Sequence, residues 1–174
     1  TENVQTVFEA SEDIGTELTD DYETTSLTPY LRDSKRLYNH IITQTRAVAK
    51  ARFEALSQGE NFHSLDAALK ENTYTDVSRT QNTIYQRLNY EKPSGTVLNV
   101  RKSMWIHPTI NRAVSVREAA RLQTFPDSFV FRGSKDKQYQ QVGNAVPPIM
   151  AKSIAKKLAQ TLTKNLYPVV SKNG

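Results

Sequence analysis

The sequence contains no cysteine. Without cysteine the chain forms no disulfide, offers no thiolate to a zinc ion and carries no thiol nucleophile. Its three histidines, His40, His63 and His107, lie far apart in the sequence and show no metal-ligand spacing. The residues therefore predict no metal site, and they exclude any mechanism in which a cysteine of this chain attacks a substrate.

Long apolar runs are also missing, since no stretch of the 174 residues approaches the roughly 20 apolar residues of a membrane span. The acidic amino terminus is unlike a secretion signal. We therefore expect no membrane contact and a location in the cytoplasm. The length of 174 residues predicts one domain or slightly more, and a composition of 37% hydrophobic and 24% charged residues is typical of a chain that folds.

Basic residues are absent from the first 30 positions, which hold eight acidic ones. The remaining residues hold 23 bases and 10 acids, a net charge of +13. A strongly basic body suits a polyanion such as DNA or RNA, although a well-solvated surface has the same composition. Charge alone leaves these two interpretations open.

The apolar pattern predicts a mixed α+β fold. Apolar residues at three- and four-residue spacing predict a helix from Asp33 or Ser34 to about Ser57, ended by Gly59. A short helical turn is expected in HSLDAALKEN. Beta-branched and aromatic residues then alternate with polar ones, which predicts short strands in TIYQRLNY, GTVLNV and SMWIHP.

Two further helices are predicted near the carboxy terminus. Ser115 and Glu118 have the spacing of a capping box, and Pro126 ends the short helix that begins there. A last helix is expected from about Pro148 to Leu166, with Ile154, Leu158 and Leu162 on its packing face. Such a helix would cover a sheet, but the chain has few strands to build one, which indicates an incomplete fold.

Two long segments identify a family resemblance. SVREAARLQTFPDSFVF, followed by YQQVGNAVPPIMAKSIA, resembles the ninth and tenth conserved motifs of DNA cytosine-5 methyltransferases. LYNH, YQRLNYEKPSGTV and IHPTINRAVSVRE resemble, more loosely, the variable target-recognition region of the bacterial enzymes. The resemblance covers most of the chain from Leu37 onwards and is sharp from about Pro108 to Ala155.

The resemblance implies the rest of the architecture. Residues 1–113 would form a small, irregular, mostly-β target-recognition region with helices. Residues 114–174 would return to the catalytic domain, where the last helix completes a Rossmann-like methyltransferase fold. Arg117, Glu118 and Arg121 would organise the two parts against each other and take no part in the chemistry. From the residues alone, the two arginines, which lie four apart on one face of the helix, could instead hold phosphates or buried carboxylates.

The family transfers a methyl group from S-adenosylmethionine to carbon 5 of a flipped cytosine, because that atom is inaccessible within the base stack. The resemblance implies that one edge of the cofactor pocket lies at Gly143, Asn144, Ala145 and Val146, in a tight turn. Glycine at such a turn permits close backbone approach and unusual dihedral angles. The Pro-Cys nucleophile, the glutamate that holds the ring nitrogen, and the glycine-rich first motif have no counterpart at the expected places.

Double-stranded DNA is the implied partner. Thr96 and Val97 match the dipeptide that ends the recognition region, near the backbone of the target nucleotide. Residues about 79–87 and 98–103 would form the loops in the major groove. Arginine reads guanine best, through two hydrogen bonds, whereas lysine more often holds phosphates. The candidates for contact with DNA, any of which could equally be an ordinary surface base, are Arg79, Arg87, Arg101, Lys102 and, for phosphate, Lys92.

Three functions remain open on the sequence. The chain is the smaller subunit of a naturally divided methyltransferase or the carboxy-terminal piece of a longer one, with the catalytic cysteine on the amino-terminal part, and is inactive alone. The second possibility is a DNA-binding module that lost catalysis, and the third is a regulatory subunit of a complete enzyme. The retained Gly143-Asn144 segment favours the first, since a DNA reader has no need of a cofactor edge.

Overall fold

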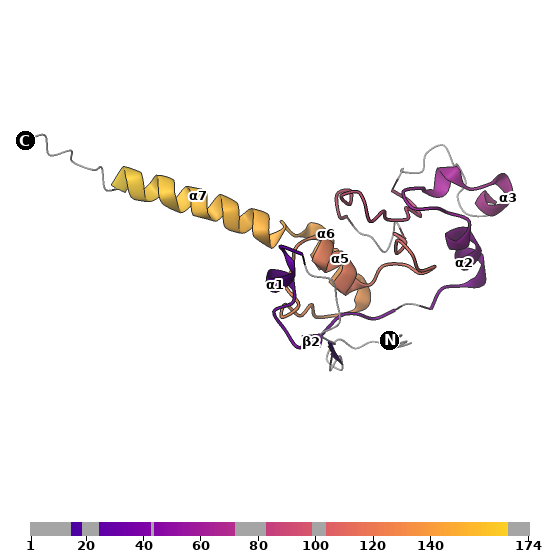
Figure 1. Ribbon diagram of the computed structural model, residues 1–174, viewed down its shortest axis with the longest axis horizontal. Helices are drawn as coiled ribbons and strands as arrows, with labels where there is room; N and C mark the ends of the chain where they lie inside the picture. Colours follow the sequence, from indigo (N-terminus) through magenta and orange to yellow (C-terminus); the bar gives the residue numbers. More distant parts are fainter. Residues whose placement is uncertain (1–14, 19–24, 43, 72–82, 99–103, 167–174) are drawn as a thin grey trace, which may run out of the picture.

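The computed structural model describes residues 15–18, 25–42, 44–71, 83–98 and 104–166. Figure 1 shows a compact body of short helices and long connecting segments, from which one long helix projects. In chain order the elements are β1 (Thr16–Glu17), α1 (Thr28–Leu31), β2 (Arg36–Leu37), α2 (Ala47–Glu54), the 3-10 helix η2 (Phe62–Ser64), α3 (Ala67–Lys70), α5 (Val116–Leu122), α6 (Lys135–Asn144) and α7 (Pro148–Leu166). This is a mixed α+β arrangement, as expected at the level of fold class.

The helix expected over residues 33–57 is wrong in its first half. Arg36 and Leu37 pair with β1 as a two-stranded antiparallel sheet, and α2 begins only at Ala47. Between them Asn39 has φ of 62°, a left-handed conformation that interrupts any right-handed helix. Tertiary contacts of Asn39, described below, therefore override the apolar periodicity.

The three strands expected between Thr83 and Pro108 are also wrong, so far as the described residues go. This part of the chain forms isolated bridges, a parallel one between Arg87 and Ile106 and an antiparallel one between Ile106 and Ala113. The short helical elements expected in HSLDAALKEN are present as η2 and α3. The described residues of this part of the chain are thus held together by side chains and irregular hydrogen bonds, with little ladder pairing.

The carboxy-terminal helices follow the sequence closely. The capping box is confirmed: Ser115 Oγ accepts from the Glu118 main-chain N–H, and the Glu118 carboxylate accepts from the Ser115 N–H. Helix α7 has the expected bounds. Helix α6 was not expected, because the Gly143-Asn144 pair predicted a tight turn there.

Two apolar cores lie in the described chain. One gathers side chains of α5, α6 and the segments before them, and its members are Val97, Trp105, Val114, Val116, Ala119, Ala120, Phe125, Phe131, Tyr139 and Val142. The second lies between residues 53 and 106 and contains Phe53, Leu56, Phe62, Leu65, Tyr85 and Ile106. Since Val97 and Trp105 belong to the first core, the two halves of the chain interlock, and the expected boundary between residues 113 and 114 stays a prediction.

Helix α7 contributes almost nothing to either core. It extends away from the body, and no other element of the described chain lies along it (Figure 1). Residues 151–163 are all exposed, and the apolar side chains of Met150, Ile154, Leu158 and Leu162 remain 48–60% accessible. A face with apolar residues at this spacing is the kind that normally packs against another surface.

Candidate functional site

Arg117 is the centre of a buried hydrogen-bond network. Its side chain is fully buried, and its guanidinium donates to the carbonyls of Tyr38 (2.9 Å), Pro126 (2.9 Å) and Phe129 (2.6 Å). Its main-chain N–H also donates to the Asn39 carbonyl, at 3.1 Å. One side chain thereby ties three stretches of chain together: the LYNH segment, α5 and the loop that follows it.

Asn39 completes this network from the other side. Its carboxamide donates to the Phe131 carbonyl (2.9 Å) and to Gln138 Oε1 (3.1 Å), and its Oδ1 accepts from the Phe131 N–H (2.9 Å). The left-handed backbone of Asn39 points these groups inward, and asparagine tolerates that conformation better than most residues. The structural importance of Asn39 and Gln138 was missed, although the LYNH pattern was the available signal for the first.

Arg121 forms the second anchor. Its Nε and Nη2 atoms donate to the two carboxylate oxygens of Asp127, at 2.9 and 2.6 Å. Asp127 is fully buried, whereas the Arg121 side chain is 31% exposed. This paired geometry holds α5 against the Phe-Pro-Asp turn that ends it. These contacts are structural, and the expected role of Arg117 and Arg121 in organising the two parts of the chain stays a prediction.

Glu118 joins α5 to the segment that precedes it. Arg112 donates to both of its carboxylate oxygens, at 2.6 and 2.8 Å. Burial raises the pKa of Glu118, but the hydrogen bonds from Arg112 and from the Ser115 N–H outweigh it and hold the pKa below its ordinary value. Glu118 is therefore ionised at neutral pH, and the Arg112 charge neutralises it.

Two histidines lie close to the Glu118–Arg112 ion pair. His40 Nδ1 lies 2.9 Å from Ser115 Oγ, and His107 Nδ1 accepts from the main-chain N–H of Ile110 at 3.2 Å. Burial lowers the pKa of both histidines, an effect that the Glu118 charge offsets only in part. Both side chains are accordingly held neutral in the folded protein.

We expect stability to fall as the pH is lowered from 7.5 to 5.5. The unfolded chain takes up protons on His40 and His107 near pH 6.5, whereas the folded chain takes them up only at lower pH, so acid favours unfolding in that window. Urea midpoints at the two pH values measure this. The double variant His40→Asn, His107→Asn should show a smaller drop, and an unchanged drop would contradict the assignment.

The expected cofactor edge is placed at the end of a helix. Gly143 and Asn144 form the last turn of α6, and Ala145 and Val146 lead into α7. The expected tight turn with unusual dihedrals at Gly143 is therefore wrong, since its backbone is helical and its φ is not positive. Asn144 and Val146 are exposed, the latter at 58%.

Two side chains fix this segment. Gln123 Nε2 donates to the carbonyls of Val142 (3.2 Å) and, more weakly, Ala145 (3.4 Å). Thr124 Oγ1 accepts from the Ile149 N–H in the first turn of α7, at 3.3 Å. Among the described residues, the Asn144 carboxamide and the Val146 N–H have no hydrogen-bond partner. The segment thus presents available polar groups from a fixed backbone.

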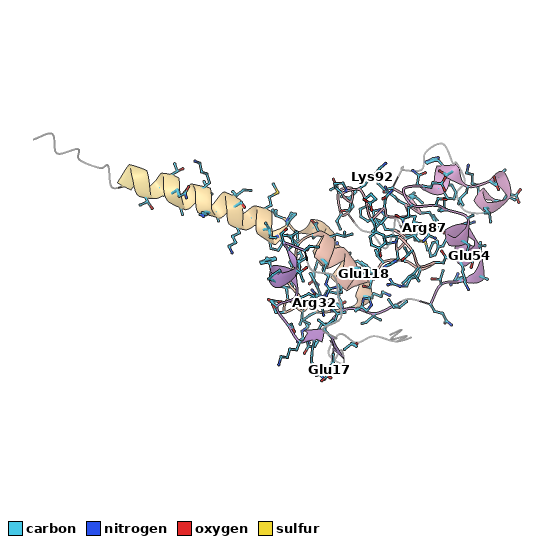
Figure 2. The ribbon with its side chains drawn as sticks, in the orientation of Figure 1. Glu17, Arg32, Glu54, Arg87, Lys92 and Glu118 are labelled. Atoms are coloured by element: carbon cyan, nitrogen blue, oxygen red, sulfur yellow. The ribbon has the colours of Figure 1, made fainter. Side chains whose placement is uncertain are left out.

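The candidates for DNA contact differ in their exposure to solvent. Thr96 is exposed, and Val97 beside it is buried in the first core. Lys92 is exposed on the loop above α5, where Figure 2 labels it. Arg79, Arg101 and Lys102 lie outside the described residues, so their roles stay predictions.

Arg87 is not available to read a base. It is only 4% exposed, and its guanidinium donates to the carbonyls of Leu56 (2.7 Å), Phe53 and His107 (2.9 Å) and to Asn111 Oδ1 (2.6 Å). The assignment of Arg87 to a guanine edge is therefore wrong for this structure. Its charge caps the carboxy-terminal end of α2, and its hydrogen bonds hold the 107–111 loop. Figure 2 labels Arg87 within the body of the protein.

The described residues contain no group of three or more side chains placed to hold a metal ion. No helix in the described part of the chain has the length and apolar character needed to cross a membrane. The features that remain are an organising network, an exposed polar helix junction and a projecting amphipathic helix.

The comparisons with known proteins agree with this picture. Residues 2–160 match the profile of C-5 cytosine-specific DNA methylases. Because that match covers most of the sequence, the chain belongs to the C-5 cytosine-specific DNA methylase family. The match begins well before Leu37, so the relationship extends further towards the amino terminus than the quoted motifs indicated.

Two relatives are bacterial type II methyltransferases. The chain is 30% identical over 140 residues to the type II methyltransferase M.DdeI of Desulfomicrobium norvegicum, covering 74% of this chain and 34% of that protein. It is 39% identical over 99 residues to the type II methyltransferase M.AquIB of Picosynechococcus, covering 51% of this chain and 71% of that protein. The chain thus spans about a third of M.DdeI, whereas M.AquIB is itself shorter than this chain.

A solved structure shares the fold. It is a crystal structure of an E. coli prophage protein assigned as a DNA modification methyltransferase, with a TM-score of 0.62 and 25% identity. The similarity covers 85% of this chain and 40% of that one. The arrangement of the described elements is therefore one that occurs as part of a larger protein of this kind.

Proposed function

We propose that this chain is the carboxy-terminal part of a DNA cytosine-5 methyltransferase, supplying target recognition and one edge of the S-adenosylmethionine pocket. The observation that carries the proposal is the exposed apolar face of α7, which starts two residues after the candidate cofactor edge. We expect such an apolar face to pack against a sheet, and such a polar edge to complete a cofactor pocket, when the sheet and the rest of the pocket are built from other residues.

The catalytic thiolate is assigned to the amino-terminal part, because this chain has no cysteine. The order of the two motifs supports this division, since both belong to the carboxy-terminal end of the family pattern. The short relative M.AquIB also supports it, because a comparably short chain carries the name of a type II methyltransferase. The parts would act together on bacterial DNA in the cytoplasm.

S-adenosylmethionine fits the polar groups at the α6–α7 junction. Asn144 offers an amide donor and acceptor, and Val146 offers a main-chain N–H, both without partners among the described residues. These groups would hold the amino and carboxylate ends of the methionine moiety, while Gln123 fixes the backbone behind them. When bound, the cofactor supplies the methyl group. The contacts to adenine and ribose are assigned to the other part.

The experiment is a reconstitution. The chain and a candidate amino-terminal part are prepared separately and mixed, and transfer of labelled methyl groups to DNA is measured for each alone and for the mixture. We expect activity only in the mixture. Activity of this chain alone would overturn the proposal, and full activity of the partner alone would instead favour a regulatory role.

A further inference from the structure

A cavity lies between the loop of residues 88–94 and helix α5. Its volume is about 300 Å³, and its walls come from both halves of the chain. Leu88, Pro108 and Leu122 give it an apolar lining. This volume is at the lower end of the range for small-molecule sites, which suits one flat ring system better than an extended ligand.

Tyr90 stands at the cavity with its ring largely free. It is 66% exposed, and its ring has no aromatic or cation partner among the described residues. Most large aromatic side chains in this part of the chain, such as Phe62 and Tyr85, are buried against other rings. An exposed ring beside an apolar cavity provides a surface on which a nucleobase can stack.

The charges at the cavity favour an anionic polymer. Lys92 is exposed and forms no ion pair within the described chain. Arg121 uses Nε and Nη2 for Asp127, which leaves Nη1 without a partner there. Glu118 also lines the cavity, but Arg112 neutralises it. Since Asp127 likewise neutralises Arg121, the excess positive charge at the rim is that of Lys92, in keeping with the net charge of +13 outside the first 30 residues.

We propose that this cavity holds a single unstacked DNA base. Tyr90 would stack on the base, Lys92 would meet the adjoining phosphate, and Arg121 Nη1 would donate to an acceptor on the base edge. Figure 2 labels Lys92 on the loop and Glu118 on α5, the two walls of this cavity. The inference rests on the proposed function, since it requires that the chain meet DNA. The base is distinct from the methylated cytosine, which must reach a nucleophile that this chain lacks.

The test compares single-stranded and duplex DNA by fluorescence anisotropy. The full chain is titrated into a dye-labelled 12-nucleotide single strand of mixed sequence and into the matching blunt duplex. Tyr90→Ala should weaken single-strand binding by about tenfold or more and leave duplex binding within about twofold, because intact base pairs cannot fill the cavity. Tyr90→Phe, the matched control, keeps the ring and should bind like the parent chain.

Lys92→Gln gives an independent readout. It should lower the magnitude of the salt slope for the single strand by about 0.7, the value for one phosphate contact. Equal effects of Tyr90→Ala on both DNAs, or no effect, would overturn the base pocket and leave the proposed function standing. Loss of association with the amino-terminal part, with DNA binding intact, would make the cavity a protein contact and also overturn it. A chain that binds neither DNA, even with that part present, contradicts both proposals.

Discussion

Replacing Arg117 with alanine should lower the free energy of unfolding by about 3–5 kcal/mol. The change deletes a buried guanidinium and leaves the carbonyls of Tyr38, Pro126 and Phe129 without their donor. It also opens a void beside the Phe131 ring, over which the guanidinium lies at 5.9 Å. Urea unfolding followed by the fluorescence of Trp105, the one tryptophan and a member of the same core, measures the effect.

Two comparisons make this measurement specific. Arg117→Lys retains the charge but has a single ammonium, which cannot reach all the carbonyls at once, so most of the loss should remain. Lys156→Ala, on the exposed surface of α7, should change the unfolding free energy by less than about 0.5 kcal/mol. A loss below about 1 kcal/mol for Arg117→Ala would show that the network adds little.

Replacing Leu158 with aspartate should abolish assembly and leave the isolated chain stable. Leu158 is 59% exposed, so a carboxylate there costs the free chain little. In the proposed complex the same carboxylate would be buried in an apolar interface without a counter-charge. We expect affinity for the amino-terminal part to fall by at least a hundredfold, with parallel loss of methyl transfer in the mixture. Isothermal titration calorimetry and the reconstitution assay measure the two effects.

Gln160→Asp is the matched control for that variant. It places the same charge on the same helix, two residues away and off the line of Ile154, Leu158 and Leu162. Binding should then stay within about threefold of the parent chain. If Leu158→Asp and Gln160→Asp behave alike, α7 does not bind through its apolar face. If Leu158→Asp unfolds the isolated chain, the helix is packed in solution against the chain itself.

The features that could be predicted from the sequence depend on local interactions. The capping box at Ser115 and Glu118 uses groups three residues apart, so their spacing alone specifies it. The bounds of α7 follow from the apolar periodicity and the prolines before it. The same periodicity predicted the packing face of α7, and the shortage of strands in the sequence indicated that the chain lacks the sheet that this face would cover.

The features that could not be predicted depend on residues distant in sequence. Asn39 and Gln138 are 99 positions apart, and no local pattern indicates that they bond. Their contact, together with Arg117, displaces the helix that periodicity favoured around Asn39. Tertiary interactions of this kind override a weak local preference.

Arg87 illustrates the same limit for the site. From the sequence it is one cation among several in a basic region, which is why a role in reading DNA was expected. Its burial depends on carbonyls that arrive from Phe53, Leu56 and His107, more than 15 positions away on either side. The charge of a residue can be read from the sequence, but its accessibility requires the fold.

Helix α7 also has a calorimetric consequence. Its 19 residues rise about 28 Å, roughly the width of a small domain. A partner that covers its apolar face must therefore contact the helix over most of its length. Removing such a strip of apolar side chains from water lowers the heat capacity of the system. The binding enthalpy should therefore become more negative as the temperature is raised.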